Sequence, residues 1–340
     1  MAAILQSMID ASEKAASVAR CCIGVGQNSL LVAEKLEGEA NTRFDKDFKT
    51  IADVLAQKAA KKLIASNYPV VTPHIRGEEC EEIDGKKIRI RSTETKTTEL
   101  LSTLVSPNLA KSLANAVHGD IKSTIPHLPQ GLPEVDISDI GIWIDPIDAT
   151  AEFIAGVRGE AEAGGGLECV TVLIGAYSLS TGDPIMGVIN QPFYQEGKGR
   201  VLWGIDVNGS RKWGGTHVNC TKYSNVILMS NAENTEIKDK FISCNYNIET
   251  VPGAGYKLMK VCLGEADSYI LSRGTTFLWD TCAPHAILKA KGGNIINFTS
   301  HQPIKYNVPK STDNEQYCNA GGIMAFNDSD AIYEVISVIQ

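Results

Sequence analysis

Apolar residues recur at helical spacing in two stretches near the start of the chain, which predicts two amphipathic helices. The first covers residues 3–22, and the second covers residues 47–66, where Tyr68-Pro69 ends it. The expected core face of the second helix consists of Phe48, Ile51, Leu55 and Ala59. Residues 85–130 are more polar, and there only Leu100–Val105 and Leu109–Val117 favour helix.

The middle of the chain has longer apolar, β-branched runs, which predict strands rather than helices. Two such runs flank the turn sequence Thr181-Gly-Asp-Pro184, which indicates an antiparallel hairpin. A strand before them should end at Pro146, because proline cannot donate a ladder hydrogen bond. The expected strands are Ile140–Asp145, Glu168–Leu179, Ile185–Asn190 and Arg200–Asp206.

In the last third, short apolar strands alternate with helical segments, and glycine follows two of the helices, which is typical of an α/β unit. We therefore expect a division near residue 200. Residues 1–200 would form an N-terminal α+β domain with two helices and an antiparallel sheet, and residues 201–340 a C-terminal α/β domain. The elements expected in the second part are 224–229, 234–241, 255–263, 268–272, 280–290 and 294–298.

Composition excludes several classes of protein. Of the 340 residues, 43% are hydrophobic, so the chain is globular rather than disordered. The formal net charge is −8, and no basic stripe follows the chain, which argues against a nucleic-acid partner. No apolar run is long enough to cross a bilayer, so we expect no membrane partner either.

The nine cysteines are scattered and contain no C-x-x-C pair, which favours reduced thiols. Charged residues interrupt Met1–Cys22, so this stretch does not have the pattern of a signal peptide. Both observations predict a cytoplasmic protein.

The segment Asp145-Pro-Ile-Asp148-Ala-Thr150 is the most informative one for chemistry. Its carboxylates follow a strand, where they could hold Mg²⁺ through oxygen, and the next helix would offer free amides to a phosphate. A plain strand-end turn with an aspartate cap explains the local spacing equally well.

Three further acidic positions have simple alternative interpretations when each is taken alone. Glu78-Glu79 resembles a solvated surface pair, Asp53 an exposed helical aspartate, and Asp280 an N-cap. His285, in the same predicted helix as Asp280, fits a buried structural histidine better than a catalytic one.

Taken in order, these four acidic segments resemble the signature of the Mg²⁺-dependent, lithium-sensitive phosphatases. This superfamily includes inositol monophosphatase, fructose-1,6-bisphosphatase, the 3′(2′),5′-bisphosphate nucleotidases and the inositol polyphosphate 1-phosphatases, and the chain most resembles the last group. The resemblance extends over nearly the whole chain. The shared stretches are Ser12–Arg20, Asp47–Gln57, Gly141–Asp148, Gly166–Gly175, Met186–Phe193, Gly253–Lys257 and Trp279–Leu288.

The resemblance implies a layered αβαβα sandwich of the inositol monophosphatase and fructose-1,6-bisphosphatase type. It implies a metal site for two or three Mg²⁺, most of whose ligands belong to the N-terminal domain, and inhibition by Li⁺. Asp53 and Thr150 would orient and activate the attacking water, with Glu78 as a further catalytic residue. The implied metal-site residues are Asp53, Glu78, Glu79, Asp145, Ile147 (through its carbonyl), Asp148 and Asp280; the implied substrate-binding residues are Asp148, Ala149, Thr150, Ser230, Gly253 and Lys257.

The chain departs from the family pattern at three places. Ala149 stands where many members have Ser or Gly, although the amide donors should persist. After Ser230 the chain continues Asn231-Ala232-Glu233, without the lysine that the family has close by. The chain is also shorter than typical members between residues 85 and 145 and around 193–224, so loops beside the pocket should differ.

The resemblance implies a small phosphorylated substrate and hydrolysis by a metal-activated water. The expected reaction is removal of the 1-phosphate from inositol 1,4-bisphosphate and from inositol 1,3,4-trisphosphate. The alternative is a 3′(2′),5′-bisphosphate nucleotidase acting on 3′-phosphoadenosine 5′-phosphate, which the missing lysine favours. A relative that binds ligand without catalysis is disfavoured, because every acidic motif position is present.

Overall fold

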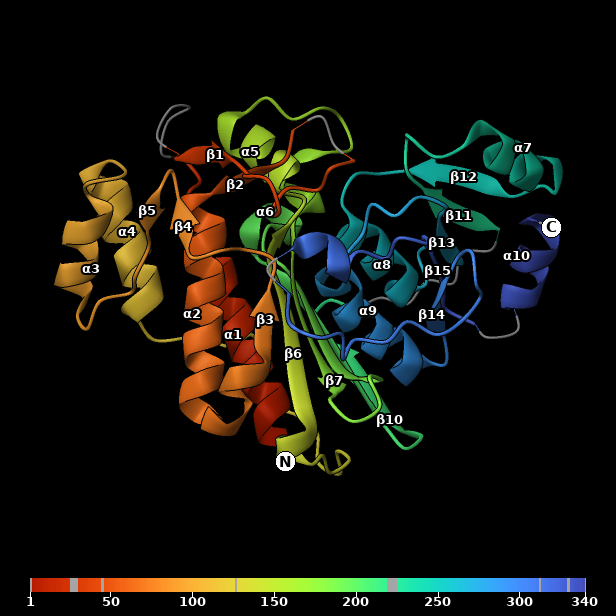
Figure 1. The fold of residues 1–340 in the computed structure, drawn as a ribbon, viewed down its shortest axis with the longest axis horizontal. Coiled ribbons are helices and arrows are strands. Elements are labelled where there is room, and N and C mark those ends of the chain that lie inside the picture. Colours follow the sequence, from red (N-terminus) through yellow and green to blue (C-terminus); the bar gives the residue numbers. More distant parts are fainter. Residues whose placement is uncertain are drawn as a thin grey trace.

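The chain forms two β-sheets that alternate with three layers of helices (Figure 1). The structure is a computed structural model, and it describes residues 2–24, 30–43, 46–125, 127–218, 225–311, 313–328 and 331–339. The order of the layers is αβαβα, with the first two helices on one side and the C-terminal helix on the other. This is the layering expected from the resemblance.

The first helical layer and the first sheet form one half of the molecule. Helices α1 (Ala2–Arg20) and α2 (Ile51–Asn67) pack against each other and cover one face of a six-stranded sheet. The strand order is β10-β9-β8-β7-β6-β3, antiparallel except for the β6–β3 pair. These strands are β3 (Ile75–Gly77), β6 (Ile140–Asp148), β7 (Thr171–Ser178), β8 (Pro184–Gln191), β9 (Arg200–Val207) and β10 (Ser210–Gly215).

The other face of this sheet is covered by the central helical layer, α8 (Ala254–Leu263) and α9 (Leu278–Lys291). Glycines let α9 lie directly on the strands: a Cβ at Gly187 would come 2.0 Å from the carbonyl oxygen of Ala283, and one at Gly175 2.5 Å from its amide nitrogen. Because helices cover both faces, β6 and β7 are buried along their whole length. This explains why their sequences are continuous apolar runs instead of alternating ones.

The second sheet lies beyond α8 and α9 and has the order β12-β11-β13-β15-β14. Strands β12, β11 and β13 are parallel, whereas β15 runs antiparallel to β13 and β14. The outermost layer is formed by α7 (Thr235–Ser243) and α10 (Ala331–Ile339). The strands are β11 (Val226–Met229), β12 (Asn247–Thr250), β13 (Ser268–Leu271), β14 (Asn294–Asn297) and β15 (Ile323–Phe326).

Smaller elements surround these layers. Strands β1 (Val32–Glu34) and β2 (Phe48–Thr50) form a ribbon just before α2, and α5 (Thr150–Arg158) follows β6. The others are β4 (Glu82–Ile83), β5 (Lys86–Lys87), α3 (Glu94–Leu101), α4 (Pro107–His118), α6 (Tyr194–Gly197), and the 3₁₀ helices η1 (Pro69–His74), η2 (Ile137–Asp139), η3 (Gly166–Cys169) and η4 (Asn314–Tyr317).

Most predicted elements are confirmed, and several boundaries are wrong. The second helix begins at Ile51 instead of residue 47, because Thr50 caps it, and Phe48 belongs to strand β2. The strand expected to end at Pro146 continues to Asp148, because the register shifts between Asp145 and Asp148 and the proline falls where no ladder bond is needed. The helix expected over Leu100–Val105 begins at Glu94, because Thr93 caps it, and it already ends at Leu101. The run before Glu78 forms the 3₁₀ helix η1 followed by β3.

The strand order shows where the chain passes from the first sheet to the second. Strands β9 and β10 belong to the first sheet, so the change from one sheet to the other occurs after Gly215. The division into domains near residue 200 stays a prediction. Ser224, expected to begin a strand, lies outside the described residues, and β11 begins at Val226.

Candidate active site

A cavity of about 630 Å³ opens between the two halves, and residues of both line it. Three helices begin at this cavity: α5 at Ala149, α8 at Gly253 and α9 at Phe277. The first amides of a helix have no partner within it, and they carry partial positive charge. The backbone therefore provides an anion-binding environment although the protein is acidic.

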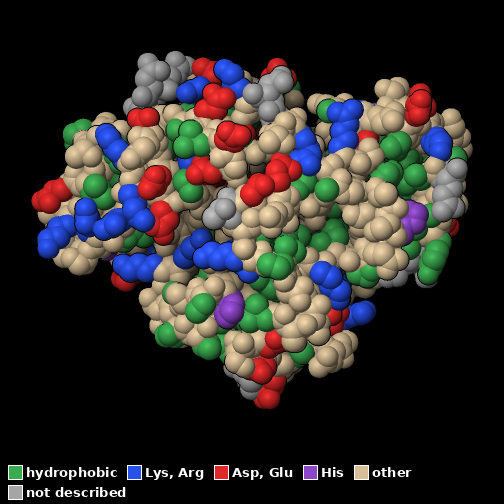
Figure 2. All heavy atoms as spheres, in the orientation of Figure 1, with side chains coloured by type: hydrophobic (Ala, Val, Ile, Leu, Met, Phe, Trp, Pro, Cys, Tyr) green, Lys and Arg blue, Asp and Glu red, His purple; other side chains and the backbone are tan. Residues whose placement is uncertain are grey.

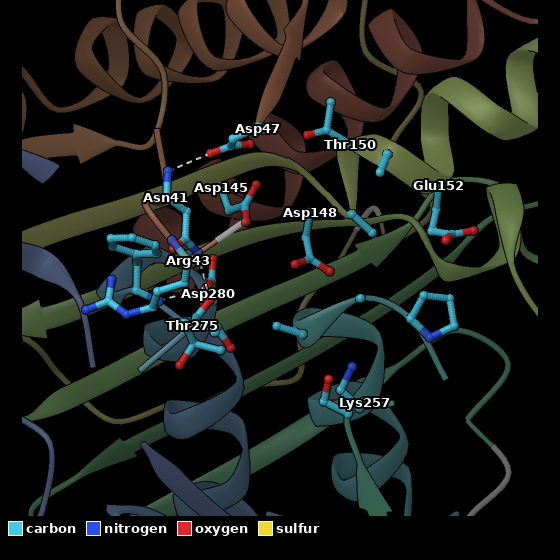
Figure 3. Close-up of a pocket in the computed structure, with 18 of the residues that line it drawn as sticks. Asn41, Arg43, Asp47, Asp145, Asp148, Thr150, Glu152, Lys257, Thr275 and Asp280 are labelled. Carbon is cyan, nitrogen blue, oxygen red and sulfur yellow. Dashed lines mark hydrogen bonds between the residues drawn. The ribbon is translucent and has the colours of Figure 1, made fainter. Parts of the chain in front are cut away.

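Three aspartates meet at this cavity, although they come from different parts of the fold. Asp145 and Asp148 lie at the end of β6, and Asp280 lies in the first turn of α9 (Figure 3). One carboxylate oxygen of each lies within 4.8 Å of those of the other two, and all three side chains are buried. Figure 2 shows that Asp and Glu side chains also gather near the centre of the visible face, between the two halves.

Burial and mutual repulsion both disfavour the charged form of these carboxylates. Burial raises the pKa of Asp145 and Asp280 well above the usual range, and neighbouring carboxylates, Glu78 and Asp148 among them, raise it further. Burial likewise raises the pKa of Asp148 to about 6, against the opposing effect of Lys257. Such a cluster ionises fully only when a cation joins it.

Asp148 is held in place by the central layer as well as by its own strand. Its Oδ2 accepts hydrogen bonds from the amide of Gly255 at 3.0 Å and from Thr171 Oγ1 at 3.2 Å. The register shift in β6 lies between Asp145 and Asp148, and both residues line the cavity together with Ile147.

Asp53 lies behind this wall and reaches it through Thr150. Asp53 Oδ1 accepts the Thr150 hydroxyl at 3.2 Å, and Oδ2 accepts the amide of Thr50 at 2.7 Å, which closes a capping box at the start of α2. Asp53 is 1% exposed, so the interpretation as an exposed helical aspartate is wrong. Burial raises its pKa to about 6.

The two glutamates after β3 are also more buried than their sequence suggested. Glu79 is 6% exposed, and Gln57 of α2 fixes its backbone by accepting its amide at 3.0 Å and donating to its carbonyl at 2.5 Å. Gly77 leaves room for that contact, since a Cβ there would lie 2.1 Å from Gln57 Oε1. The solvated-surface interpretation of this pair is therefore wrong.

Sequence reasoning missed Lys35, which lies between these glutamates. Its ammonium is 2.5 Å from Glu78 Oε1 and 3.8 Å from Asp47 Oδ1. It also lies 3.1 Å from Glu79 Oε1, an ion pair without hydrogen-bond geometry. Burial lowers the pKa of Lys35, but the three carboxylates outweigh it and hold the pKa well above the usual range. The polar sequence around Lys35 gives no signal of this burial.

The residues expected to bind substrate are divided equally between the two halves, and Ser230, Gly253 and Lys257 lie in the C-terminal half. Lys257 in α8 is buried, donates to the Val251 carbonyl at 2.9 Å, and lies across the cavity from Asp47 and Thr150 in Figure 3. Burial lowers its pKa to about 8. Ala149 has the left-handed φ of +67°, and a Cβ at Gly253 would lie 3.3 Å from its Cβ, so the starts of α5 and α8 are in close contact.

The structure brings nearly all the sequence-predicted residues to one place. Asp53 and Glu79 lie just behind the wall, whereas His285 is a buried structural residue between Tyr306 and Asn294. Burial lowers the pKa of His285 to about 3, so its ring is neutral. The predicted residues on the wall itself are Glu78, Asp145, Ile147, Asp148, Ala149, Thr150, Ser230, Gly253, Lys257 and Asp280.

The donor atoms at this wall match a hard divalent cation. They are carboxylate oxygens, which Mg²⁺ prefers, and no described Cys or His belongs to the Asp145–Asp148–Asp280 group. All three carboxylates are buried, and buried carboxylates are stable in the charged form only when a cation accompanies them. The residues present therefore fit a Mg²⁺ site.

Comparison with known proteins identifies the family. The model of the inositol monophosphatase family matches residues 6–331. The chain belongs to the inositol monophosphatase family.

Individual members differ in how similar they are to this chain. It is 36% identical to the inositol polyphosphate 1-phosphatase of Homo sapiens, with 100% of the chain and 97% of that protein covered. It is 28% identical to the 3′(2′),5′-bisphosphate nucleotidase 1 of Rattus norvegicus, over 95% of the chain and 90% of that protein.

Solved structures agree with the fold. The extragenic suppressor protein suhB from Bartonella henselae matches with a TM-score of 0.56 at 18% identity, over 99% of this chain and 98% of that one. At this identity the match supports only the layered fold. Among the described helices, none has the length and apolar character that crossing a membrane requires.

Proposed function

We propose that the chain is a Mg²⁺-dependent phosphatase that removes the 1-phosphate of inositol 1,4-bisphosphate and of inositol 1,3,4-trisphosphate. The observation that carries the proposal is the buried group of Asp145, Asp148 and Asp280 facing the starts of α5, α8 and α9. At this cavity wall, carboxylates that can bind a metal ion lie next to backbone amides that can bind a phosphate. The greater identity to an inositol polyphosphate 1-phosphatase than to a nucleotidase favours the inositol phosphate.

Bound Mg²⁺ would supply a Lewis acid that lowers the pKa of water and neutralises charge on the leaving oxygen. Its ligands would be Glu78, Asp145, Asp148, Asp280 and the Ile147 carbonyl, with two or three ions in the site. Glu79 and Asp53 would support these ligands from behind the wall.

The chain's own residues would move the proton and orient the phosphate. Thr150 Oγ1 can take a proton from water and pass its own to Asp53 Oδ1, 3.2 Å away, whose pKa of about 6 suits a base at neutral pH. The amides at the start of α5, from Asp148 to Thr150, would bind the scissile phosphate. Ser230, Gly253 and Lys257 would contact the rest of the substrate.

A phosphate-release assay with Mg²⁺ tests the proposal on inositol 1,4-bisphosphate, inositol 1,3,4-trisphosphate and 3′-phosphoadenosine 5′-phosphate. We expect turnover of the inositol phosphates, loss of turnover in Asp53→Asn with an unchanged fold by circular dichroism, and inhibition by Li⁺. A large preference for the nucleotide would replace the proposal by the nucleotidase alternative. Near-wild-type activity of Asp53→Asn would remove the role given to Asp53.

A further inference from the structure

Cationic side chains also line the cavity, and they differ in whether the protein already uses them. Lys257 is buried and donates to Val251 O, and Arg43 holds both carboxylate oxygens of Glu315 at 2.9 and 2.8 Å. Arg273 is exposed to the cavity, and no hydrogen bond or ion pair among the described residues engages its guanidinium. Lys46, the other cation on the wall, is equally exposed and unengaged in the described part of the chain.

Of these two cations, only Arg273 lies beside the turn that follows β11, which has no positive charge. Strands β11 and β13 are parallel, with Ile227 opposite Ser268, so the residues that follow them emerge at the same edge of the sheet. After β11 comes the turn Ser230–Glu233, in which Ser230 and the uncharged Ala232 line the cavity. Arg273 follows β13 at that edge.

A buried glutamate fixes the two loops to each other. Glu233 is 4% exposed, and its Oε2 accepts the amide of Ser272 at 2.8 Å while its Oε1 accepts the Ser272 hydroxyl. The residue directly before Arg273 is therefore anchored to the Ser230–Glu233 turn. The backbone of Arg273 is held at the cavity rim while its side chain stays available for a ligand.

We propose that Arg273 is a specificity-determining residue that binds the second phosphate of a bisphosphate substrate, the one that is not cleaved. This inference rests on the proposed function. The metal-site carboxylates need a cation before they accept the scissile phosphate, whereas a second phosphate needs positive charge from elsewhere on the wall. A guanidinium can hold a phosphate through two parallel hydrogen bonds, and Arg273 supplies, from the loop after β13, positive charge beside the Ser230–Glu233 turn, which has none.

The test compares Arg273→Gln with the matched variant Lys46→Gln, because both replace an exposed cation of the same cavity. For Arg273→Gln we expect the KM for inositol 1,4-bisphosphate to rise about tenfold or more, as for loss of a charged hydrogen bond, with kcat changed less than about twofold. The inhibition constant of inositol 1-phosphate as a competitor should stay unchanged, because it has no second phosphate. Arg273→Lys should recover part of the loss, and Lys46→Gln should have no such selective effect.

An unchanged KM for the bisphosphate in Arg273→Gln would overturn the inference while leaving the proposed function in place. Equal weakening of the bisphosphate and of inositol 1-phosphate would also overturn it, since that result indicates a general effect on the cavity. A selective loss in Lys46→Gln instead of Arg273→Gln would assign the role to Lys46. Wild-type protein that hydrolyses no inositol phosphate would overturn the proposed function, and this inference with it.

Discussion

The cavity has two groups of buried acids, and the protein treats them differently. On one side, Glu78 and Glu79 share the ammonium of Lys35. On the other side, Asp145 and Asp280 have no ion pair with any described cation, and their pKa values are raised well above the usual range by burial and by their neighbours. The glutamate side has a cation of the chain among its carboxylates, although burial still raises the pKa of Glu79 to about 8. The aspartate side has no such cation among the described residues and depends on a ligand.

We infer from this difference that Lys35 stabilises the fold, whereas Asp145 and Asp280 lower the stability of the metal-free protein and serve function. Carboxylates held together without a counter-charge oppose folding when they ionise, whereas a lysine placed between carboxylates supports it. Substitutions on the two sides should therefore have opposite effects on the metal-free protein.

The largest expected effect comes from Asp280→Asn. We expect activity to fall at least about a thousandfold, which corresponds to about 4 kcal/mol of barrier, because a metal ligand is lost. The same variant should be more stable than wild type without metal at alkaline pH, where Asp280 ionises against its neighbours, because Asn carries no charge and can still accept the Phe277 amide. Phosphate release and urea unfolding in EDTA measure the two quantities.

Asp183→Asn is the matched control, because Asp183 forms only a half-exposed ion pair with Lys305. It should leave activity unchanged and alter stability by less than about 1 kcal/mol. If Asp280→Asn is less stable than wild type in EDTA, repulsion among the aspartates does not lower the stability of the metal-free protein. That result would contradict the difference drawn between the two sides.

Lys35→Met tests the glutamate side and should act in the opposite direction. Removing the cation leaves Glu78 and Glu79 together without compensation, which we expect to destabilise the metal-free protein by about 3 kcal/mol. Lys305→Met removes a lysine paired at the surface with Asp183, and it should cost less than about 1 kcal/mol. Equal losses in the two variants by urea unfolding would contradict the role of Lys35.

The smallest expected effect concerns the unfolding free energy that the protein gains on binding Mg²⁺, which should depend on pH. The pKa values of Asp53 and Asp148 are about 6 in the folded chain, above those of unfolded aspartates, so the folded state holds extra protons between about pH 4 and 6. The unfolding free energy of the metal-free protein should therefore fall as pH rises through this window. Mg²⁺ binds the ionised form, so its stabilising effect should grow in the same direction.

Thermal unfolding with Mg²⁺ and with EDTA, at pH 5.5 and pH 8, measures this dependence. We expect the Mg²⁺-induced gain to be larger at pH 8 by at least about 1.4 kcal/mol, the equivalent of one pKa unit. A gain that is the same at both pH values would mean that these carboxylates are already ionised without metal.

Much of the fold could be predicted from the sequence, because long apolar runs such as Thr171–Ser178 reflect burial on both faces of a sheet. The acidic positions could be found as a set because the resemblance joined segments that are weak alone. Burial of Asp53 and Glu79 could not be foreseen, because it arises from packing between α2 and the segment after β3, which are separated in sequence.

The elements and residues that were missed have related causes. Strands β12 and β15 have four residues each, and β10 is an exposed edge strand, so its sequence lacks the apolar run that marks β7. Lys35 and Arg273 occur in ordinary polar stretches. Their partners or neighbours come from other loops, so only the folded chain shows what each charge faces.

Asp53 and Asp280 share one feature with a wider consequence: each occupies the third position of a helix and accepts the amide that precedes that helix. Asparagine could keep that hydrogen bond while losing the charge. Relatives that lose activity should therefore carry Asn at position 53 or 280 more often than Ala. Alanine would also remove the hydrogen bond that stabilises the start of the helix. In newly sequenced relatives, Asn at either position would mark a family member that kept its architecture after its catalysis was lost.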